Sequence, residues 1–380
     1  MQKAIIILNV IVFITSGCVQ ATKKQMETQT GNYPVCQEDT LFNSSKRITL
    51  KTESVKQKKI NLQGTGTAFV DWGDGKRDSC KFFSQLSLEA FEHSYDIPST
   101  YIITITGNNI FNVDCCNQIT SIDVSKYPTL EALGCDNSPL KNLDISKNIA
   151  LTSLACINCQ LTSLDISKNT ALMDLSCEKN QLTSLDVSNN AALIDLSCEE
   201  NQLTILDVSK NVALVTLRCY ENQLTILDVS NCPKLTDLTC CNNKITSLDV
   251  SKCFALTNLT CDYNKVINLD VSKCLELTNL SCSSNKITNL NVSKSAKLEY
   301  LDCQNNQLVS LSVKDNQMLK VLYCNENKLS KAVLNTLFVE LPDKTNEDSG
   351  TMHITGNWGA RSCNRNIAEK KGWTVFWEEE

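Results

Sequence analysis

Histidine is almost absent from this sequence, with only His93 and His353 among 380 residues. Because imidazole is the usual group for acid–base and metal chemistry near neutral pH, this scarcity counts against an enzyme. The apolar stretch at residues 4–14 is too short to span a bilayer. An excess of basic residues is also missing: the formal net charge is -6, which gives no sign of general nucleic-acid affinity.

Cysteine, by contrast, is abundant and regularly placed. Of the 21 cysteines, ten follow one another at intervals of 21 residues, and leucine stands two and five residues before each of them. These ten, termed the cysteine ladder, are Cys135, Cys156, Cys177, Cys198, Cys219, Cys240, Cys261, Cys282, Cys303 and Cys324. Such a period, with leucines at fixed offsets, is the signature of a leucine-rich-repeat solenoid, in which each turn buries its apolar edge against its neighbours.

Each repeat contains a second, similar motif ten residues after the first. Leu-x-Cys is followed by Leu-Asp-Val or Leu-Asp-Ile, as at residues 185–187. Alternation with a period of two predicts that the Leu and Cys, or Leu and Val, side chains point inward from short strands. We therefore expect a mainly β solenoid with two parallel sheets back to back, about 4.8 Å per turn.

Asparagine recurs at two corners of each repeat. An Asn side chain both donates and accepts hydrogen bonds, so we interpret both columns as structural groups that satisfy inward-turned backbone amides. The first column, three residues after the ladder, comprises Asn180, Asn201, Asn222, Asn243, Asn264, Asn285, Asn306 and Asn327. The second comprises Asn148, Asn169, Asn190 and Asn211 and continues as Cys232, Cys253 and Cys274.

The start of the chain has the features of an export signal at residues 1–17: Lys3, the apolar stretch, and small residues before Cys18. Thr-Ser-Gly-Cys resembles a bacterial lipobox, which implies lipidation of Cys18 and a membrane anchor. An ordinary secretory signal with a chance cysteine is the alternative. Residues 18–45, rich in Thr, Gln, Lys and Ser, predict a tether of low order. The expected location is the cell envelope, at the outer membrane or cell surface, or outside the cell if Cys18 is not acylated.

Residues 46–108 show a different pattern, with short β-like runs and glycine turns at Gly64–Gly66 and Gly73–Gly75. Trp72-Gly-Asp-Gly and His93-Ser-Tyr resemble the polycystic-kidney-disease-type (PKD) domain, which implies an immunoglobulin-like β-sandwich. A few strands that cap the solenoid are the alternative. The aspartates here, Asp71, Asp74 and Asp78, are interpreted as hairpin residues rather than calcium ligands, because their spacing is not that of an EF-hand.

The repeats are expected over residues 109–329, with a degenerate first repeat in which Asp114 takes the place of the cysteine. Residues 330–380 predict a C-terminal α/β cap. Ser330 can begin a helix that is apolar on one face, and strands are expected near 351–355 and 373–377 with a short helix between them. Such a cap protects the last sheet edge from pairing with another chain.

The ladder thiols are expected to be free and buried, as small hydrophobes. Disulfides between neighbouring rungs and a chain of soft metal ions are the alternatives. Any disulfides should be among the cysteines outside the repeats, namely Cys18, Cys36, Cys80, Cys115, Cys116 and Cys363. Cys363 and His353 are the only sequence-near nucleophile and base, and no catalytic motif surrounds them. We predict no catalytic residues, no cofactor and no metal site.

The outward aspartates of the second motif allow two interpretations. They either accept hydrogen bonds from turn amides or hold cations in a row. The column comprises Asp123, Asp144, Asp165, Asp186, Asp207, Asp228, Asp249 and Asp270.

Outward positions beside the Leu-x-Cys strands vary from turn to turn, whereas Leu-Asp-Val is nearly constant. Aromatic and arginine side chains on a regular scaffold are typical of binding hot spots. A soluble surface without a ligand is the alternative. The predicted ligand-binding residues are Arg218, Tyr220, Glu221, Asp262, Tyr263, Tyr300 and Tyr323.

Taken together, the repeats and caps resemble bacterial cell-surface leucine-rich-repeat lipoproteins with nested 21-residue repeats, and more distantly the internalins. The resemblance implies surface display and binding of a protein or glycan ligand. A purely structural envelope protein is the alternative, with an enzyme as a distant second. The sequence leaves the oligomeric state open.

Overall fold

The structure, a computed structural model, describes residues 46–53, 57–83, 87–116, 118–345 and 349–378. The predicted signal, Cys18, Cys36 and the tether lie outside these residues. The chain divides into two compact units, residues 1–182 and 183–380, which are described separately. No helix among the described residues has the length and apolar character needed to cross a membrane.

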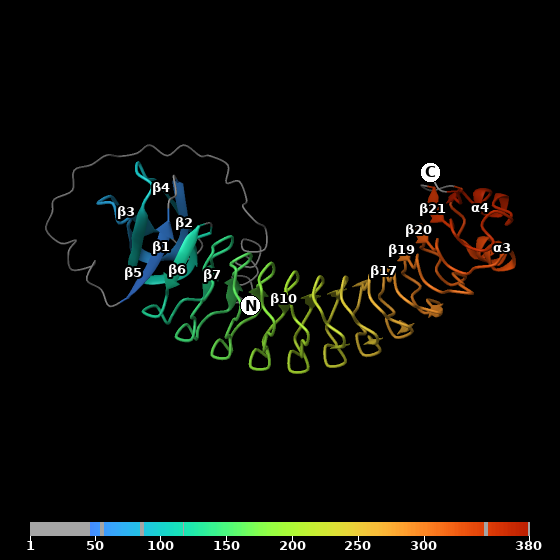
Figure 1. The fold of residues 1–380 in the computed structure, drawn as a ribbon, viewed down its shortest axis with the longest axis horizontal. Coiled ribbons are helices and arrows are strands. Elements are labelled where there is room, and N and C mark those ends of the chain that lie inside the picture. Colours follow the sequence, from blue (N-terminus) through green and yellow to red (C-terminus); the bar gives the residue numbers. More distant parts are fainter. Residues whose placement is uncertain (1–45, 54–56, 84–86, 117, 346–348, 379–380) are drawn as a thin grey trace. The chain divides into compact units, whose positions relative to one another are not determined.

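Unit 1 begins with an antiparallel β unit. Its central strand β5 pairs with β1 on one side and β2 on the other; β6 extends the sheet beyond β1, while β3 and β4 both pair with β2. Inward residues such as Ile48 and Leu50 are fully buried because apolar and polar residues alternate along β1. The strands are β1 (Arg47–Glu53), β2 (Gln57–Asp71), β3 (Arg77–Phe82), β4 (Leu88–Ser94), β5 (Thr100–Asp114) and β6 (Ile119–Asp123) (Figure 1).

One of the two predicted glycine turns is wrong. Gly64 and Gly66 lie inside β2, where the register with β5 shifts, so they form a bulge in one long strand instead of separating two short ones. A side chain at Gly64 would collide with the Asn109 carbonyl oxygen, 2.6 Å from a Cβ, which is why glycine is needed there. The second turn is confirmed: Gly73 and Gly75 have positive φ angles and join β2 to β3.

The aspartates at this turn serve the hairpin. Asp71 accepts a hydrogen bond from the Gly73 amide at 2.9 Å, and Asp74 accepts one from the Lys76 amide at 3.0 Å. The indole Nε1 of Trp72 donates to Asp78 at 2.6 Å. The hairpin interpretation of these residues is confirmed.

The first solenoid turn is one residue shorter than predicted. The C-terminal part of β5 pairs in parallel with β7, with Asp114 opposite Gly134. The Cys115 amide donates to the Gly134 carbonyl, just as the Cys135 amide donates to the Ala155 carbonyl. Cys115 is fully buried and therefore occupies the first position of the ladder; the expectation that Asp114 does so is wrong. A 20-residue first turn hides this cysteine from a search at a period of 21.

The remaining strands of unit 1 continue this parallel sheet, one three-residue strand per turn. They are β7 (Ala132–Gly134), β8 (Ser153–Ala155) and β9 (Asp174–Ser176). All three residues of each strand are buried, as are Cys135, Cys156 and Cys177.

Unit 2 has the same construction, and its parallel strands pair in register at steps of 21 residues as far as β20. Figure 1 shows these strands side by side, one from each successive turn. They are β10 (Asp195–Ser197), β11 (Thr216–Arg218), β13 (Asp237–Thr239), β15 (Asn258–Thr260), β17 (Asn279–Ser281), β19 (Tyr300–Asp302) and β20 (Val321–Tyr323). The ladder cysteine after each strand is fully buried, which confirms the inward orientation.

The predicted second sheet forms over part of the solenoid only. Segments of the second motif, Leu-Asp-Val or in one case Leu-Asn-Val, pair as strands in four turns of unit 2, namely β12 (Leu227–Asp228), β14 (Leu248–Asp249), β16 (Asn268–Asp270) and β18 (Asn289–Asn291). In the turns that contain Leu143, Leu164, Leu185, Leu206 and Leu311, this leucine and the Val or Ile two residues later are buried without ladder pairing. Here the structure corrects the expectation of two continuous sheets.

Both asparagine columns are structural, as predicted. Asn243 is 8% exposed; its Nδ2 donates to the carbonyls of Cys219, Cys240 and Cys241 at 3.0–3.2 Å, and its Oδ1 accepts from the Leu224 amide at 2.9 Å. In the second column, Asn211 donates to two carbonyls of the preceding turn at 2.9 and 3.0 Å, while its buried Oδ1 accepts no hydrogen bond from the described residues. This column therefore satisfies carbonyls and not the amides that were expected. Where cysteine replaces asparagine there, its thiol makes the equivalent contact, as from Cys253 to the Val229 carbonyl at 3.6 Å.

The C-terminal cap matches its prediction closely. Helix α3 (Lys331–Glu340) begins at Ser330, whose hydroxyl accepts a hydrogen bond from the Val333 amide. Leu334, Leu337 and Phe338 are its buried face. Two further strands, β21 (Gly350–His353) and β22 (Trp373–Phe376), extend the parallel sheet beyond β20, and α4 (Asn366–Glu369) lies between them in the chain.

Candidate ligand-binding face

The predicted ligand-binding residues all belong to unit 2, on or beside the outward side of its parallel sheet. In most of its strands the central leucine is buried while the residues on either side are partly exposed. The first and third residues of each strand, together with the two residues after each ladder cysteine, are termed the outer face. Every turn presents one set of four such positions.

Arg218 is the third residue of β11, and its side chain is 40% exposed. One guanidinium nitrogen lies 3.5 Å from the Asp195 carboxylate and 3.5 Å from the Ser197 hydroxyl. Burial raises the pKa of Asp195, and the positive charge of Arg218 opposes that rise. A weak ion pair with Asp195 of the preceding turn thus positions Arg218, and it uses only one nitrogen of the guanidinium group.

Glu199 lies on the same part of the outer face and is only 6% exposed. Burial raises the pKa of its carboxyl group, and its Oε2 atom accepts no hydrogen bond from the described residues. A buried acceptor without a donor is costly, so this atom stands out as a place where a ligand donor would be favourable. Sequence reasoning did not select Glu199 as a site residue; burial separates it from its half-buried neighbour Glu200.

The carboxylate of Asp262 is hydrogen-bonded to other residues of the protein. Its two carboxylate oxygens accept hydrogen bonds from the Ser281 hydroxyl at 2.8 Å, and Oδ1 also accepts from the Ser283 amide at 2.6 Å. These bonds join two consecutive turns. The side chain therefore fixes the position of the next turn on the outer face. This structural role is additional to its predicted role as a ligand contact.

Glu221 and Tyr263 occupy the corner two residues after the ladder cysteine, where φ is +52° for both. Equivalent corners in unit 2 carry Asn242, Ser284 and Asn305, also at positive φ. A bulky aromatic residue is unfavourable in this left-handed conformation, by about 1 kcal/mol. Tyr263 is nevertheless present and 61% exposed, which marks it as a residue that folding does not require. Tyr220, half-buried, precedes the corner of its own turn.

Four aromatic side chains form a continuous cluster on the outer face. Tyr300 meets Tyr323 edge-on with ring centroids 5.9 Å apart, Tyr323 meets His353 at 4.8 Å, and His353 stacks on Phe376 at 4.4 Å. These four residues, from β19, β20, β21 and β22, are termed the aromatic cluster. Burial raises the pKa of Tyr300 to about 12, so its hydroxyl stays protonated at neutral pH.

The structure therefore brings together Tyr300 and Tyr323 from the predicted set, and adds His353 and Phe376 to them. Tyr220 and Tyr263 lie in earlier turns, apart from the cluster. The two added residues come from cap strands that were correctly predicted as strands. Their outward direction depends on β21 and β22 continuing the parallel sheet in register, which the sequence pattern does not reveal.

The aspartate column is structural. In every repeat of the column the aspartate Oδ1 accepts a hydrogen bond from the amide two residues later, at 2.8–3.0 Å. Hydrogen bonds from Ser251 hold the pKa of Asp249 below its usual value, and those from Ser272 do the same for Asp270. This confirms the interpretation as turn acceptors. Among the described residues, no group of three or more His, Cys, Asp or Glu side chains is arranged to hold a metal ion.

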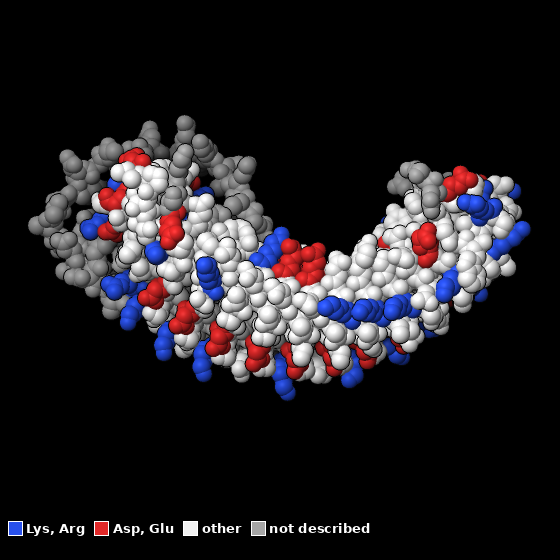
Figure 2. All heavy atoms as spheres, viewed as in Figure 1, with Lys and Arg blue, Asp and Glu red and all other residues white. Residues whose placement is uncertain are grey.

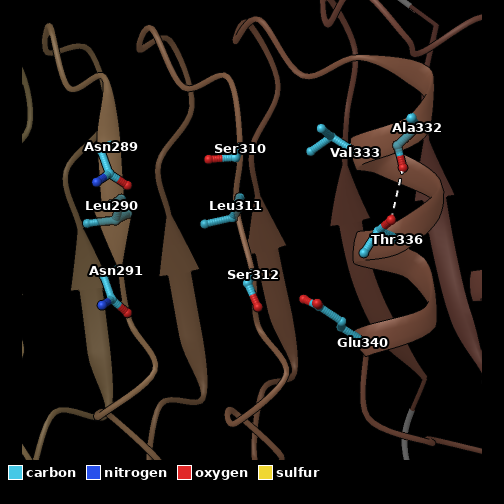
Figure 3. A pocket seen from close by; sticks show the side chains of 10 residues that line it. All are labelled: Asn289, Leu290, Asn291, Ser310, Leu311, Ser312, Ala332, Val333, Thr336 and Glu340. Atoms are coloured by element: carbon cyan, nitrogen blue, oxygen red, sulfur yellow. Dashed lines mark hydrogen bonds between the residues drawn. The ribbon is translucent and has the colours of Figure 1, made fainter.

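A hollow of about 470 Å³ lies on the second-motif side of unit 2, between segments 289–291 and 310–312 of two late turns and helix α3. Figure 3 shows Asn289, Asn291, Ser310 and Ser312 on one side of it and Thr336 and Glu340 on the other. Glu340 accepts a hydrogen bond from the Val313 amide at 3.1 Å, and Thr336 donates to the Ala332 carbonyl. The Glu340 bond joins the cap to the solenoid, whereas the Thr336 bond lies within α3, so the hollow is the seam where the cap helix meets the last turns.

The two residues considered as nucleophile and base have different surroundings. His353 lies within the aromatic cluster, whereas the Cys363 thiol donates to the Ala360 carbonyl and is 8% exposed. Burial raises the pKa of Cys363, with Arg365 opposing, which is the reverse of what a thiolate nucleophile needs. The other histidine, His93, bonds to Asp74 at 2.8 Å and stacks on Trp72.

The geometry defines the chain as a leucine-rich-repeat solenoid, and solved structures of that class match it. The functional domain of InlJ from Listeria monocytogenes, described as including a cysteine ladder, is 33% identical, with a TM-score of 0.52. That match covers 64% of this chain and 59% of the InlJ chain, so this chain spans less than two thirds of it. An internalin, inlF, from Listeria monocytogenes str. 4b F2365 has a TM-score of 0.58 at 20% identity, covering 71% of this chain and 87% of its own. No protein-family model and no curated protein matches the chain.

Proposed function

We propose that this chain is an exported recognition protein, anchored by lipid at Cys18, that binds a protein or glycan ligand through the outer face of unit 2. The observation that carries the proposal is the aromatic cluster. In three earlier turns the position of Tyr323 carries Thr239, Thr260 or Ser281 and that of Tyr300 carries Asp237, Asn258 or Asn279, so the fold does not require an aromatic residue at either place. Partly exposed aromatic rings on a rigid sheet are what binding hot spots use.

The neighbours support a recognition role more than a catalytic one. The functional domain of InlJ includes a cysteine ladder, the feature around which this chain is also built. The rigid columns of hydrogen bonds leave the face residues free to differ from turn to turn without loss of the fold. The resemblance of residues 46–108 to a PKD domain belongs to the same proposal, as a spacer between anchor and solenoid.

The binding test compares the full chain with two matched variants. A pull-down from host-cell extract and from neighbouring bacteria uses wild type, a Tyr300→Ser and Tyr323→Ser variant, and a Thr204→Ser and Thr225→Ser control on the opposite side. We expect the double tyrosine variant to bind a captured partner more weakly by about 1 kcal/mol or more, with the control unchanged. Partner capture that survives the tyrosine changes and is lost in the control would show that the wrong face is assigned.

The anchoring test uses detergent partitioning. Wild-type protein should enter the detergent phase, and Cys18→Ser should release it or leave an unprocessed precursor. Unchanged partitioning of the variant would refute the lipid anchor and leave secretion.

The alternative is a structural envelope protein without a specific ligand. It gains support if neither extract yields a partner that distinguishes the variants.

A further inference from the structure

A straight row of lysines crosses the turns of unit 2, separate from the aromatic cluster. Lys244, Lys265, Lys286 and Lys328 each stand four residues after a ladder cysteine, with Gln307 at the equivalent position between the last two. These four lysines are termed the lysine row. Figure 2 shows part of it as an unbroken line of basic side chains over the turns that Figure 1 colours yellow to orange.

The backbone holds the row in strict register. The amide of Lys244 donates to the Leu224 carbonyl at 2.8 Å, and that of Lys265 donates to the Ile245 carbonyl at 2.8 Å. The amides of Lys286, Gln307 and Lys328 repeat this bond at 2.9 Å. Successive positions are therefore one turn apart, about 4.8 Å at the spacing of paired strands.

The row has no acidic partner among the described residues. Two of its amines contact neutral side chains: Lys244 donates to Gln223 at 3.1 Å and Lys328 to Gln307 at 3.2 Å. Elsewhere unit 2 does pair charges across turns, as Lys320 with Glu299 at 2.7 Å. Like charges stacked at strand spacing repel one another. Folding alone therefore does not explain why this position is lysine in three consecutive turns.

In the central turns, the residues within two positions of each row lysine are uncharged, and the carboxylate in the turn of Lys265, Asp262, is bonded to Ser281 and Ser283. Asn242 and Ser284 lie on one side of it, and the exposed side chains of Thr246 and Thr288 on the other. Hydroxyl and amide groups thus flank the positive charges. Tyr263 adds one exposed aromatic ring beside Lys265.

We propose that the lysine row binds an acidic polysaccharide that lies along the solenoid axis of unit 2. Such a chain presents both anionic groups for the lysines and hydroxyl groups for the flanking polar side chains. Tyr263 offers a ring for one sugar face. Single-stranded nucleic acid fits less well, because its binding sites stack successive bases on several aromatic residues, and the row has one ring beside it. The row also lacks the arginine forks that recognise phosphate in a bidentate way.

The experiment compares two variants with the same loss of charge on the same turns. The row variant carries Lys244→Gln, Lys265→Gln and Lys286→Gln; glutamine is the natural residue at this position in Gln202, Gln223 and Gln307. The control carries Lys252→Gln, Lys273→Gln and Lys294→Gln, three exposed lysines beside the second motif. Binding of the full chain to dextran sulfate, to uncharged dextran and to single-stranded DNA is measured over a range of salt concentrations.

We expect the row variant to bind dextran sulfate about tenfold or more weakly than wild type, with a shallower dependence on salt, because three ionic contacts are lost. The control should stay within about twofold of wild type. Equal weakening of both variants would overturn the proposal, since net charge alone would then explain binding. So would comparable binding of uncharged dextran, or tighter binding of single-stranded DNA than of dextran sulfate. Because the aromatic cluster is intact in both variants, failure here leaves the proposed function untouched.

Discussion

At the scale of single residues, one asparagine per turn makes the side-chain hydrogen bonds that close the corner. Asn243 donates to the carbonyl oxygens of two turns and accepts from the amide of Leu224, all in a buried position. Removing the side chain leaves these backbone groups without partners, and each such group costs about 1–3 kcal/mol.

We therefore expect Asn243→Ala to lower the free energy of unfolding by about 2 kcal/mol or more, measured by urea denaturation. Asn231→Ala is the control, since Asn231 is exposed on the other side of the solenoid, and it should change stability by less than about 0.5 kcal/mol. If Asn243→Ala and Asn231→Ala change stability by the same small amount, the backbone groups at the corner form hydrogen bonds with water once the asparagine is removed.

The aspartate column makes stability depend on pH. Hydrogen bonds from the following serine depress the folded-state pKa of Asp207, Asp249 and Asp270 below the ordinary value of 3.8. A depressed pKa means that the stabilisation is present above pH 3.8 and is lost as the pH falls through the folded-state value. Asn291 holds the same position and accepts the same hydrogen bond, from Ser293 at 3.0 Å, without a charge.

Changing these three aspartates to asparagine should thus make the urea midpoint less sensitive to acid below pH 4 than it is in the wild type. Asp315→Asn, at an exposed aspartate outside the column, is the control for the loss of one exposed carboxylate. A triple variant that loses stability in acid as steeply as the wild type would contradict the assignment.

At the scale of elements, the C-terminal cap depends on how α3 begins. The Ser330 hydroxyl satisfies the Val333 amide, and the buried face of the helix carries Leu334, Leu337 and Phe338. Ser330→Ala should destabilise the protein by about 1 kcal/mol in thermal or urea unfolding, whereas Ser330→Asp should retain the cap. If both variants lose the same amount, the hydroxyl is not the stabilising group.

Repetition made the solenoid predictable at this scale, and breaks in repetition were missed. Ladder, leucine and asparagine columns recur often enough for the sequence to predict the inward face and the corners. The two cap strands lie outside the repeat and were predicted from their own short β-like runs. The 20-residue turn that brings Cys115 into the ladder occurs once, and so does the bulge at Gly64. The extent of the second sheet depends on small backbone shifts that identical Leu-Asp-Val motifs do not encode. On the outer face, the tyrosines could be recognised in the sequence because they depart from the repeat. His353 and Phe376 could not, because their outward direction depends on the register in which β21 and β22 pair with the sheet.

At the scale of the whole molecule, the ladder concentrates thiols in the dry interior. Cys282 and Cys303 are fully buried, and burial raises the pKa of both well above the ordinary value. Because the thiolate is the reactive form, the folded protein should react slowly with a thiol reagent and rapidly once unfolded in denaturant without reductant. A parallel sample treated first with reductant gives the total count. Fewer than ten reactive thiols in the unreduced, unfolded sample would refute the free-thiol ladder.

The register of unit 2 also has a genetic consequence. Strand residues pair at steps of 21 residues, and the corner asparagines bond at constant separations along the chain. A gene that encodes such near-identical blocks can gain or lose one whole block by recombination between them. The longer or shorter protein can still form the same strand and asparagine hydrogen bonds between turns, because each turn packs against a neighbour similar to the one it had before. Each event carries one set of surface side chains into or out of the protein, so the length of the lysine row and its distance from the aromatic cluster can change in a single step.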